Sequence, residues 1–159
     1  MKISRILYIA GMVISFFASI IVYIKTIAPT VPFWDGGEFI AAAYTLGVPH
    51  PPGSPLYVLI GRLFSLLPVM DSNIAWRVNF SSSLFSSLTV LMVYLTIVKI
   101  VTIGQNRAKL SLSESLIIYS GSLTGALLLA FSDTFWFNAV EAEVYALSML
   151  IMTVCTWLT

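Results

Sequence analysis

Two acidic residues and the only histidine of the chain lie close together in residues 33–56, a stretch that holds four of the seven prolines. Asp35 and Glu38 are separated by two glycines, and His50 follows in the segment Gly-Val-Pro-His-Pro-Pro-Gly-Ser-Pro. A carboxylate in a loop can take a proton from an attacking hydroxyl or bind a divalent cation. We therefore predict Asp35 and Glu38 as catalytic residues.

A structural role is open for the same residues. Asp35 and Glu38 have the spacing of a capping box, with Asp35 as the N-cap, and Trp34 with Phe39 matches a hydrophobic staple. His50 alone could be an exposed loop residue, but the prolines around it restrict the backbone and can hold an imidazole in a fixed position. We predict His50 as a substrate-binding residue.

A second acidic group occurs much later, in the segment Asn-Ala-Val-Glu-Ala-Glu-Val-Tyr. Asn138 and Glu141 again have capping spacing, whereas Glu143 does not. On one helix the two glutamates would lie about 200° apart, so we expect one of them to face the protein interior. Tyr145 is one turn from Glu141 and could bond to it. We predict Glu141, Glu143 and Tyr145 as substrate-binding residues.

Arg62 and Arg77 are cations on the predicted outer face, the face that also carries these acids. They either anchor the chain at the membrane interface or clamp a lipid-linked phosphate, for which the guanidinium fork is suited. We predict both as substrate-binding residues. The chain has one histidine and one cysteine, so no zinc site is predicted. A divalent cation held by carboxylates stays open.

The composition indicates a protein that crosses the membrane several times. Hydrophobic residues make up 58% of the 159 residues, charged residues make up 9%, and the mean hydropathy is +0.96. Soluble domains carry about 25% charged residues. The formal net charge of +1 gives no reason to expect a nucleic-acid partner.

The apolar stretches predict an all-α integral membrane protein. A helix needs roughly 20 apolar residues to span a bilayer. Residues 55–67 are apolar but too short to span, so we expect a short interfacial helix within the first outer loop, 28–73. Four stretches are long enough, and we treat residues 1–159 as a single transmembrane domain with spans at 6–27, 74–102, 112–131 and 139–159.

The charges predict the orientation. With a cytoplasmic N-terminus, five basic residues lie inside and three outside, in agreement with the positive-inside rule. Six of the seven acidic residues then lie outside. We therefore expect a polar site on the outer face. Four helices leave little room for a catalytic cavity, so we also expect the chain to be the N-terminal part of a longer protein or a subunit that needs partners.

Two motifs resemble those of a family of multi-spanning membrane proteins. The first comprises Trp34-Asp35-Gly36-Gly37-Glu38, Leu46-Gly47-Val48 and His50 to Leu56, and the second comprises Trp136 and Ala139 to Tyr145. Bacterial members are catalogued as a domain of unknown function, and animal relatives are transmembrane O-mannosyltransferases. The resemblance covers essentially the whole chain, but only the N-terminal part of the usual family length.

The resemblance implies a GT-C type glycosyltransferase in a bacterial inner membrane. Its partners would be a polyprenyl-phosphate sugar donor, membrane lipid and a protein acceptor, and the sugar would be a hexose such as mannose. Asp35 corresponds to the acidic residue that such enzymes carry in the first outer loop, with Glu38 beside it.

Two other functions stay open. An ion-coupled transporter would use the outer acids as cation or proton sites, although the sequence offers no helix broken by glycine or proline at mid-membrane. A non-catalytic scaffold subunit would use its acids only to cap helices.

Overall fold

The computed structural model describes residues 2–68, 73–105 and 110–159. Three residues of the predicted charge distribution lie outside them, namely Asp71, Arg107 and Lys109, and so does the side chain of Lys2.

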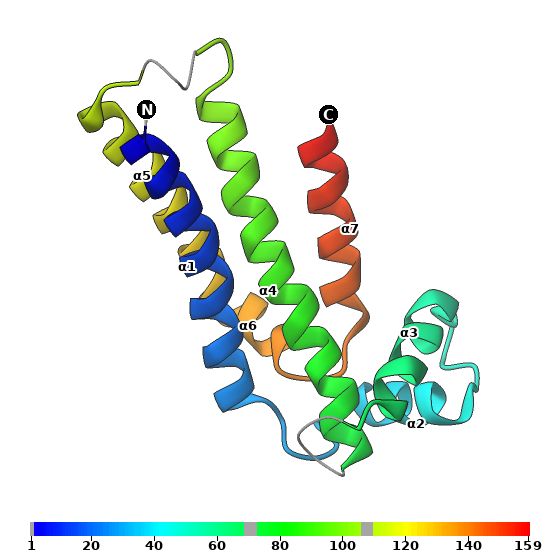
Figure 1. Cartoon of the computed structure of the whole chain (residues 1–159). Helices are drawn as coiled ribbons and strands as arrows, with labels where there is room; N and C mark the ends of the chain where they lie inside the picture. Colours follow the sequence, from blue (N-terminus) through cyan, green and yellow to red (C-terminus); the bar gives the residue numbers. More distant parts are fainter. Residues whose placement is uncertain (1, 69–72, 106–109) are drawn as a thin grey trace.

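The described residues form helices and contain no strand, which confirms the all-α fold (Figure 1). Within residues 2–68, 73–105 and 110–159, three helices are long and apolar enough to cross a membrane, and a fourth crossing is formed if a bent pair of helices counts as one span. The chain is thus a multi-pass membrane protein. The elements are α1 (Lys2–Thr26), α2 (Gly36–Thr45), α3 (Pro55–Leu66), α4 (Ile74–Val101), α5 (Leu112–Ala130), α6 (Asp133–Ala139) and α7 (Val144–Leu158).

Helix α4 is the centre of the bundle and packs against α1, α5 and α7. Small hydroxyl side chains allow this close approach. The Ser83 hydroxyl donates a hydrogen bond of 2.8 Å to the carbonyl oxygen of Ala139, and the Ser87 hydroxyl donates to that of Ser83. Five serines of α4 are buried between the helices: Ser81, Ser82, Ser83, Ser86 and Ser87.

The long helices alternate in direction, so the loops gather at two ends of the bundle. Both chain termini lie at one end, as Figure 1 shows. At the opposite end, which we call the loop end, the amide of Ala28 donates a 2.9 Å hydrogen bond to the carbonyl of Val140. This bond joins the segment after α1 to the segment before α7. The two acidic motifs of the sequence therefore share the loop end.

The fourth predicted span differs from the structure. Residues 139–159 do not form one helix, because α6 ends at Ala139, α7 begins at Val144, and the two axes are bent by 112°. We call Val140–Glu143 the break segment. It contains no glycine or proline. Tertiary contacts replace the helical hydrogen bonds there: α4 binds the backbone groups of Ala139 and Glu143, and the segment after α1 binds Val140.

This break also overturns two smaller predictions. Asn138 lies inside α6, where its amide donates to the carbonyl of Thr134, so it forms no capping box with Glu141. Glu141 and Glu143 are not on one helix, and their predicted 200° separation does not apply. The capping box of Ser111 and Glu114 at the start of α5 is confirmed, with both of its reciprocal hydrogen bonds present.

The first loop folds into α2 and α3, which pack on each other and on the first turns of α4. Gly61 permits this contact, since a Cβ there would lie 2.8 Å from the Cβ of Ala43. The outward side of α3 is apolar, as expected of an interfacial helix. Its exposed residues are Leu56, Leu59, Leu63 and Leu66.

Candidate functional site

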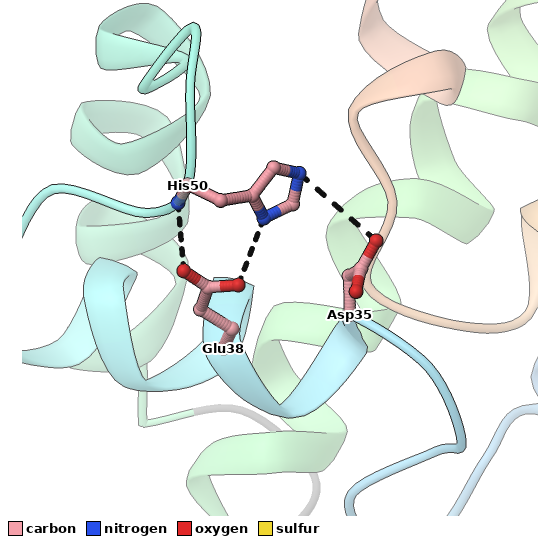
Figure 2. Close-up of side chains that lie close together, drawn as sticks. All are labelled: Asp35, Glu38 and His50. Carbon is pink, nitrogen blue, oxygen red and sulfur yellow. Dashed lines mark hydrogen bonds and ion pairs between the residues drawn. The ribbon is translucent and has the colours of Figure 1, made fainter.

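The proline-rich loop brings His50 onto the first turns of α2 (Figure 2). One oxygen of Glu38 accepts a 2.7 Å hydrogen bond from the backbone amide of His50, and the other lies 2.8 Å from His50 Nδ1. His50 Nε2 lies 4.0 Å from an oxygen of Asp35. We call these three residues the first-loop cluster. The carboxylate of Glu38 thus fixes both the loop and the ring.

The pairing changes the proton affinities of both partners. Hydrogen bonds from the side chain and backbone of His50 hold the pKa of Glu38 below its ordinary value. The hydrogen bond to Glu38 raises the pKa of His50, and the negative charges of Glu38 and Asp35 add to the effect. Each shift favours the charged form, so the structure supports an ion pair between them.

The predicted capping box at the start of α2 is wrong. Asp35 occupies the N-cap position, but its φ of −79° and ψ of −8° are helical and its side chain makes no capping hydrogen bond. Trp34 is 86% exposed, with φ of 63°, and forms no staple. Phe39 instead packs against the rings of His50 and Tyr57. The structure therefore leaves the Asp35 carboxylate exposed beside the imidazole.

The first-loop cluster also has the residue types of a cation site. One ligand atom from each of Asp35, Glu38 and His50 can be chosen so that all lie within 4.8 Å of one another. Carboxylate and imidazole groups bind divalent cations. Both oxygens of Glu38 are engaged by His50, however. A cation would therefore find Asp35 and His50 Nε2 the more available ligands.

The break segment lies against this cluster. If Gly36 carried a Cβ, that atom would lie 3.6 Å from the carbonyl oxygen of Ala142, so the start of α2 contacts the break segment directly. Glu143 is anchored to α4, because its amide donates to the hydroxyl of Ser82 over 3.3 Å. Side chains from two motifs about a hundred residues apart are thus brought together.

The two glutamates of the break segment lie outside the helices and are shielded from solvent. Glu141 is only 6% exposed and Glu143 is half-buried. Burial raises the pKa of Glu141. Burial also raises the pKa of Glu143 to about 7, with further contributions from the negative charges of Glu141 and Asp35. Glu143 thus holds its proton far more readily than an ordinary glutamate.

Sequence reasoning missed two residues of the site, Tyr57 and Ser82. The Tyr57 side chain is 4% exposed, and its hydroxyl lies beside Ser82 without completing a hydrogen bond among the described residues. The negative charge of Glu143 acts on this hydroxyl, and burial raises its pKa. A tyrosine in an apolar helix and a serine in a serine-rich helix gave no signal of this role, because packing accounts for both.

The other residues that were predicted to bind substrate lie at the margins of the site. The Arg62 guanidinium donates to the carbonyl of Tyr44 at the end of α2 and lies 5.2 Å from the Tyr44 ring centroid. Arg77 donates to the carbonyl of Leu67 over 2.9 Å. Tyr145 is 60% exposed and lines a separate cavity of about 420 Å³ between α4, α5, α6 and α7. It makes no hydrogen bond to Glu141 among the described residues.

Comparisons with known proteins agree with the resemblance of the two motifs. The family model of the protein O-mannosyl-transferase TMEM260 N-terminal domain matches residues 35–159. The protein O-mannosyl-transferase tmem260 of Dictyostelium discoideum is 30% identical over 99% of this chain and 18% of its own length. The mouse protein O-mannosyl-transferase TMEM260 is 32% identical over 92% of this chain and 19% of its own length. The chain thus spans about a fifth of these relatives. No solved structure matches it.

Proposed function

Since the chain belongs to the family of the protein O-mannosyl-transferase TMEM260 N-terminal domain, we propose that it supplies the acid–base site of a membrane glycosyltransferase. The donor is a hexose, such as mannose, carried on a polyprenyl phosphate, and the acceptor is a protein hydroxyl. Both relatives are named protein O-mannosyl-transferases, which supports the reaction. The GT-C type and the lipid-linked donor rest on the resemblance of the motifs.

The observation that carries the proposal is the position of the Asp35 carboxylate. It is exposed, makes no capping bond, and lies 4.0 Å from an imidazole that Glu38 fixes. In the proposed step the acceptor oxygen bonds to the anomeric carbon while the bond from that carbon to the phosphate oxygen breaks. The electron pair stays with the phosphate, and the hydroxyl proton goes to Asp35. His50, charged through its pairing with Glu38, stabilises the developing negative charge.

A transfer assay in isolated membranes tests this function, using the longest natural form of the protein. We expect labelled sugar to pass from polyprenyl phosphate to protein in the wild type. Asp35→Asn should reduce the rate about 10²- to 10⁴-fold at equal expression. Asp133→Asn is the control, since Asp133 is exposed at the start of α6 and outside the first-loop cluster. Equal rates in wild type and Asp35→Asn would remove the base from the proposal.

Arg62 and Arg77 are a secondary part of the proposal, as ligands of the donor phosphate. Arg62 and Arg77 each donate to a backbone carbonyl, so a phosphate would have to replace that partner. Arg77→Ala should impair transfer at normal expression if it binds the donor. Unchanged transfer would exclude Arg77 from the site.

A divalent cation at Asp35 and His50 Nε2 is a variant of the same proposal. Such a cation would neutralise the phosphate of the donor. Chelation with EDTA followed by addition of Mg²⁺ or Mn²⁺ decides between the variants. Loss and recovery of transfer would support the cation, and insensitivity would support the ion pair of His50 and Glu38 alone.

The proposed orientation puts the N-terminus in the cytoplasm and residues 28–73 on the outer face of a bacterial inner membrane. The multi-pass fold and the distribution of basic residues support the orientation. The bacterial location rests on the resemblance of the motifs. Cys155 is the only cysteine, so Cys155→Ser gives a background for single-cysteine labelling. A cysteine at Trp34 should react with an impermeant thiol reagent added outside, and labelling only after lysis would reverse the orientation.

An ion-coupled carrier is the second candidate, because the break between α6 and α7 places two glutamates where a helix is interrupted. Carriers use interrupted helices of this kind to bind ions. Uptake of substrate into vesicles that depends on an ion gradient, without sugar transfer, would favour the carrier. The scaffold alternative loses its basis at Asp35, whose side chain caps no helix.

A further inference from the structure

The proposed donor must bring a phosphate anion to a site that is dominated by acids. The first-loop cluster and the break segment together contain Asp35, Glu38, Glu141 and Glu143, with His50 as the single cationic group. Arg62 and Arg77 are engaged with backbone carbonyls at the margins. Four ionised carboxylates would repel the phosphate at short range. Unless a divalent cation neutralises the phosphate, at least one of the acids must therefore be neutral, or must donate a hydrogen bond, when the donor is bound.

Glu143 is the acid whose surroundings favour this state. Its backbone is fixed on α4 by Ser82, and its side chain is half-buried at the junction with α2 and α3. No ion pair joins Glu143 to a lysine or arginine among the described residues.

The titratable groups that act on Glu143 come from each neighbouring segment. Asp35 precedes α2, His50 lies in the loop before α3, Tyr57 lies on α3, and Glu141 shares the break segment. Two of these groups are carboxylates and repel a second negative charge. The backbone amide of Val144 and the charge of His50 favour the ionised form of Glu143, and His50 is already paired with Glu38.

Burial and the negative charges of Glu141 and Asp35 raise the pKa of Glu143 to about 7, so a large share of the protein carries a neutral Glu143 near neutral pH. A bound phosphate would add another negative charge and increase that share. A neutral carboxyl in such a position can donate a hydrogen bond, and then a proton, to an anionic leaving group.

We infer that Glu143 is the acid of the transfer reaction and donates its proton to the phosphate oxygen that leaves the anomeric carbon. This inference rests on the proposed function. The bond from carbon to phosphate oxygen breaks, the electron pair stays on that oxygen, and the Glu143 proton binds it. The acceptor proton passes to Asp35. The two carboxyls thus divide the acid and base roles. Afterwards water takes the proton from Asp35 and returns a proton to Glu143.

Glu141, two residues before Glu143, offers a matched control. Its side chain is more buried than that of Glu143, and its pKa is raised by burial rather than by the charge of Asp35 or His50. A change that only disturbed the fold of the break segment should therefore appear in both variants. A change specific to the acid should appear in Glu143→Gln alone.

The test is the pH dependence of the transfer rate in the wild type, Glu143→Gln and Glu141→Gln. The acid must be protonated, so the wild-type rate should fall as the pH rises above about 7. Glu143→Gln can donate a hydrogen bond but no proton. We expect its rate to be about 10²-fold lower at neutral pH and to lose the decline at high pH. Glu141→Gln should keep the decline but move it to lower pH, because the charge of Glu141 no longer raises the pKa of Glu143.

The outcomes separate the inference from the function on which it rests. If Glu143→Gln transfers sugar at the wild-type rate and shows the same decline at high pH, the inference is overturned and the proposed function stays intact. Absence of transfer by the wild type at every pH would overturn both. The NMR signal of His50, the only histidine, reports whether the site is folded in each variant. Glu143→Asp, which keeps a carboxyl, should retain the decline even if Glu143→Gln fails to fold.

Discussion

The first-loop cluster and the break segment are both acidic and lie at the same end of the bundle, yet their carboxyl groups behave in opposite ways. Glu38 is exposed and paired with His50, and its pKa is lowered. Glu141 and Glu143 are shielded and form no ion pair with a lysine or arginine in the part of the chain that the structure describes, and their pKa values are raised. Residue type therefore does not fix the role of a carboxyl, because pairing and burial decide its charge.

The two regions are also held in place by different kinds of contact. The first-loop cluster is held by its own side chains, since Glu38 binds both the amide and the ring of His50. The break segment is held through its own backbone, by hydrogen bonds to the segment after α1 and to Ser82 of α4, and its acidic side chains form no ion pair among the described residues. One region can thus present a stable charge, and the other can exchange a proton.

Among changes that leave every carboxyl in place, the largest effect should come from separating the two regions. In Gly36→Ala, the new Cβ would lie 2.4 Å from Cγ of the rigid Pro32 ring, and the start of α2 would have to move away from the break segment. Displacements of about 1 Å can reduce catalysis roughly 10²-fold. We expect a loss of that order in the transfer assay. Gly121→Ala is the control, because nothing lies within 4 Å of its added Cβ.

A smaller effect is expected from breaking the ion pair alone. Glu38→Gln weakens the hydrogen bond and removes the negative charge that hold the His50 pKa above its ordinary value, so that pKa should fall. Titration of the single histidine by NMR measures the change. We expect roughly tenfold slower transfer, since the ring loses its fixed position. Glu114→Gln, in the capping box of α5, should leave the histidine titration unchanged, and an equal shift there would contradict the pairing.

The pairing should also give the first loop a pH window of maximal order. The lowered pKa of Glu38 contributes stability above its ordinary value of 4.5, and this is lost as the pH falls through the lowered pKa. The raised pKa of His50 contributes stability below 6.5, and this is lost as the pH rises through the raised pKa. The amide of His50 should therefore be most protected from hydrogen exchange between these values. Protection that is the same in Glu38→Gln would refute the assignment.

The smallest effect on transfer is expected at the opposite end of the bundle. Ser111→Ala removes the N-cap of α5 and should cost about 1 kcal/mol of stability. Thermal unfolding measures this loss. The transfer rate should stay at the wild-type level, since the cap is remote from both acidic regions. A rate that falls with the cap would show that the two ends are coupled.

Local chemistry explains what could be predicted. Long apolar runs require helices in a membrane, so the positions of α1, α4 and α5 follow from hydropathy. The capping box of Ser111 and Glu114 could be predicted for the same reason, because its partners are three residues apart. The same rule failed at Asp35 and Glu38, where a residue twelve positions away bound the glutamate instead.

The helical membrane fold and the gathering of the acids at one end follow from hydropathy and the order of the spans. The interruption between α6 and α7, the partner of Glu38 and the burial of Glu143 follow from no local pattern. These features depend on contacts between α1, α2, α4 and the break segment. A pattern of neighbouring residues contains no information on such distances, and a carboxyl takes its proton affinity from whatever surrounds it in space.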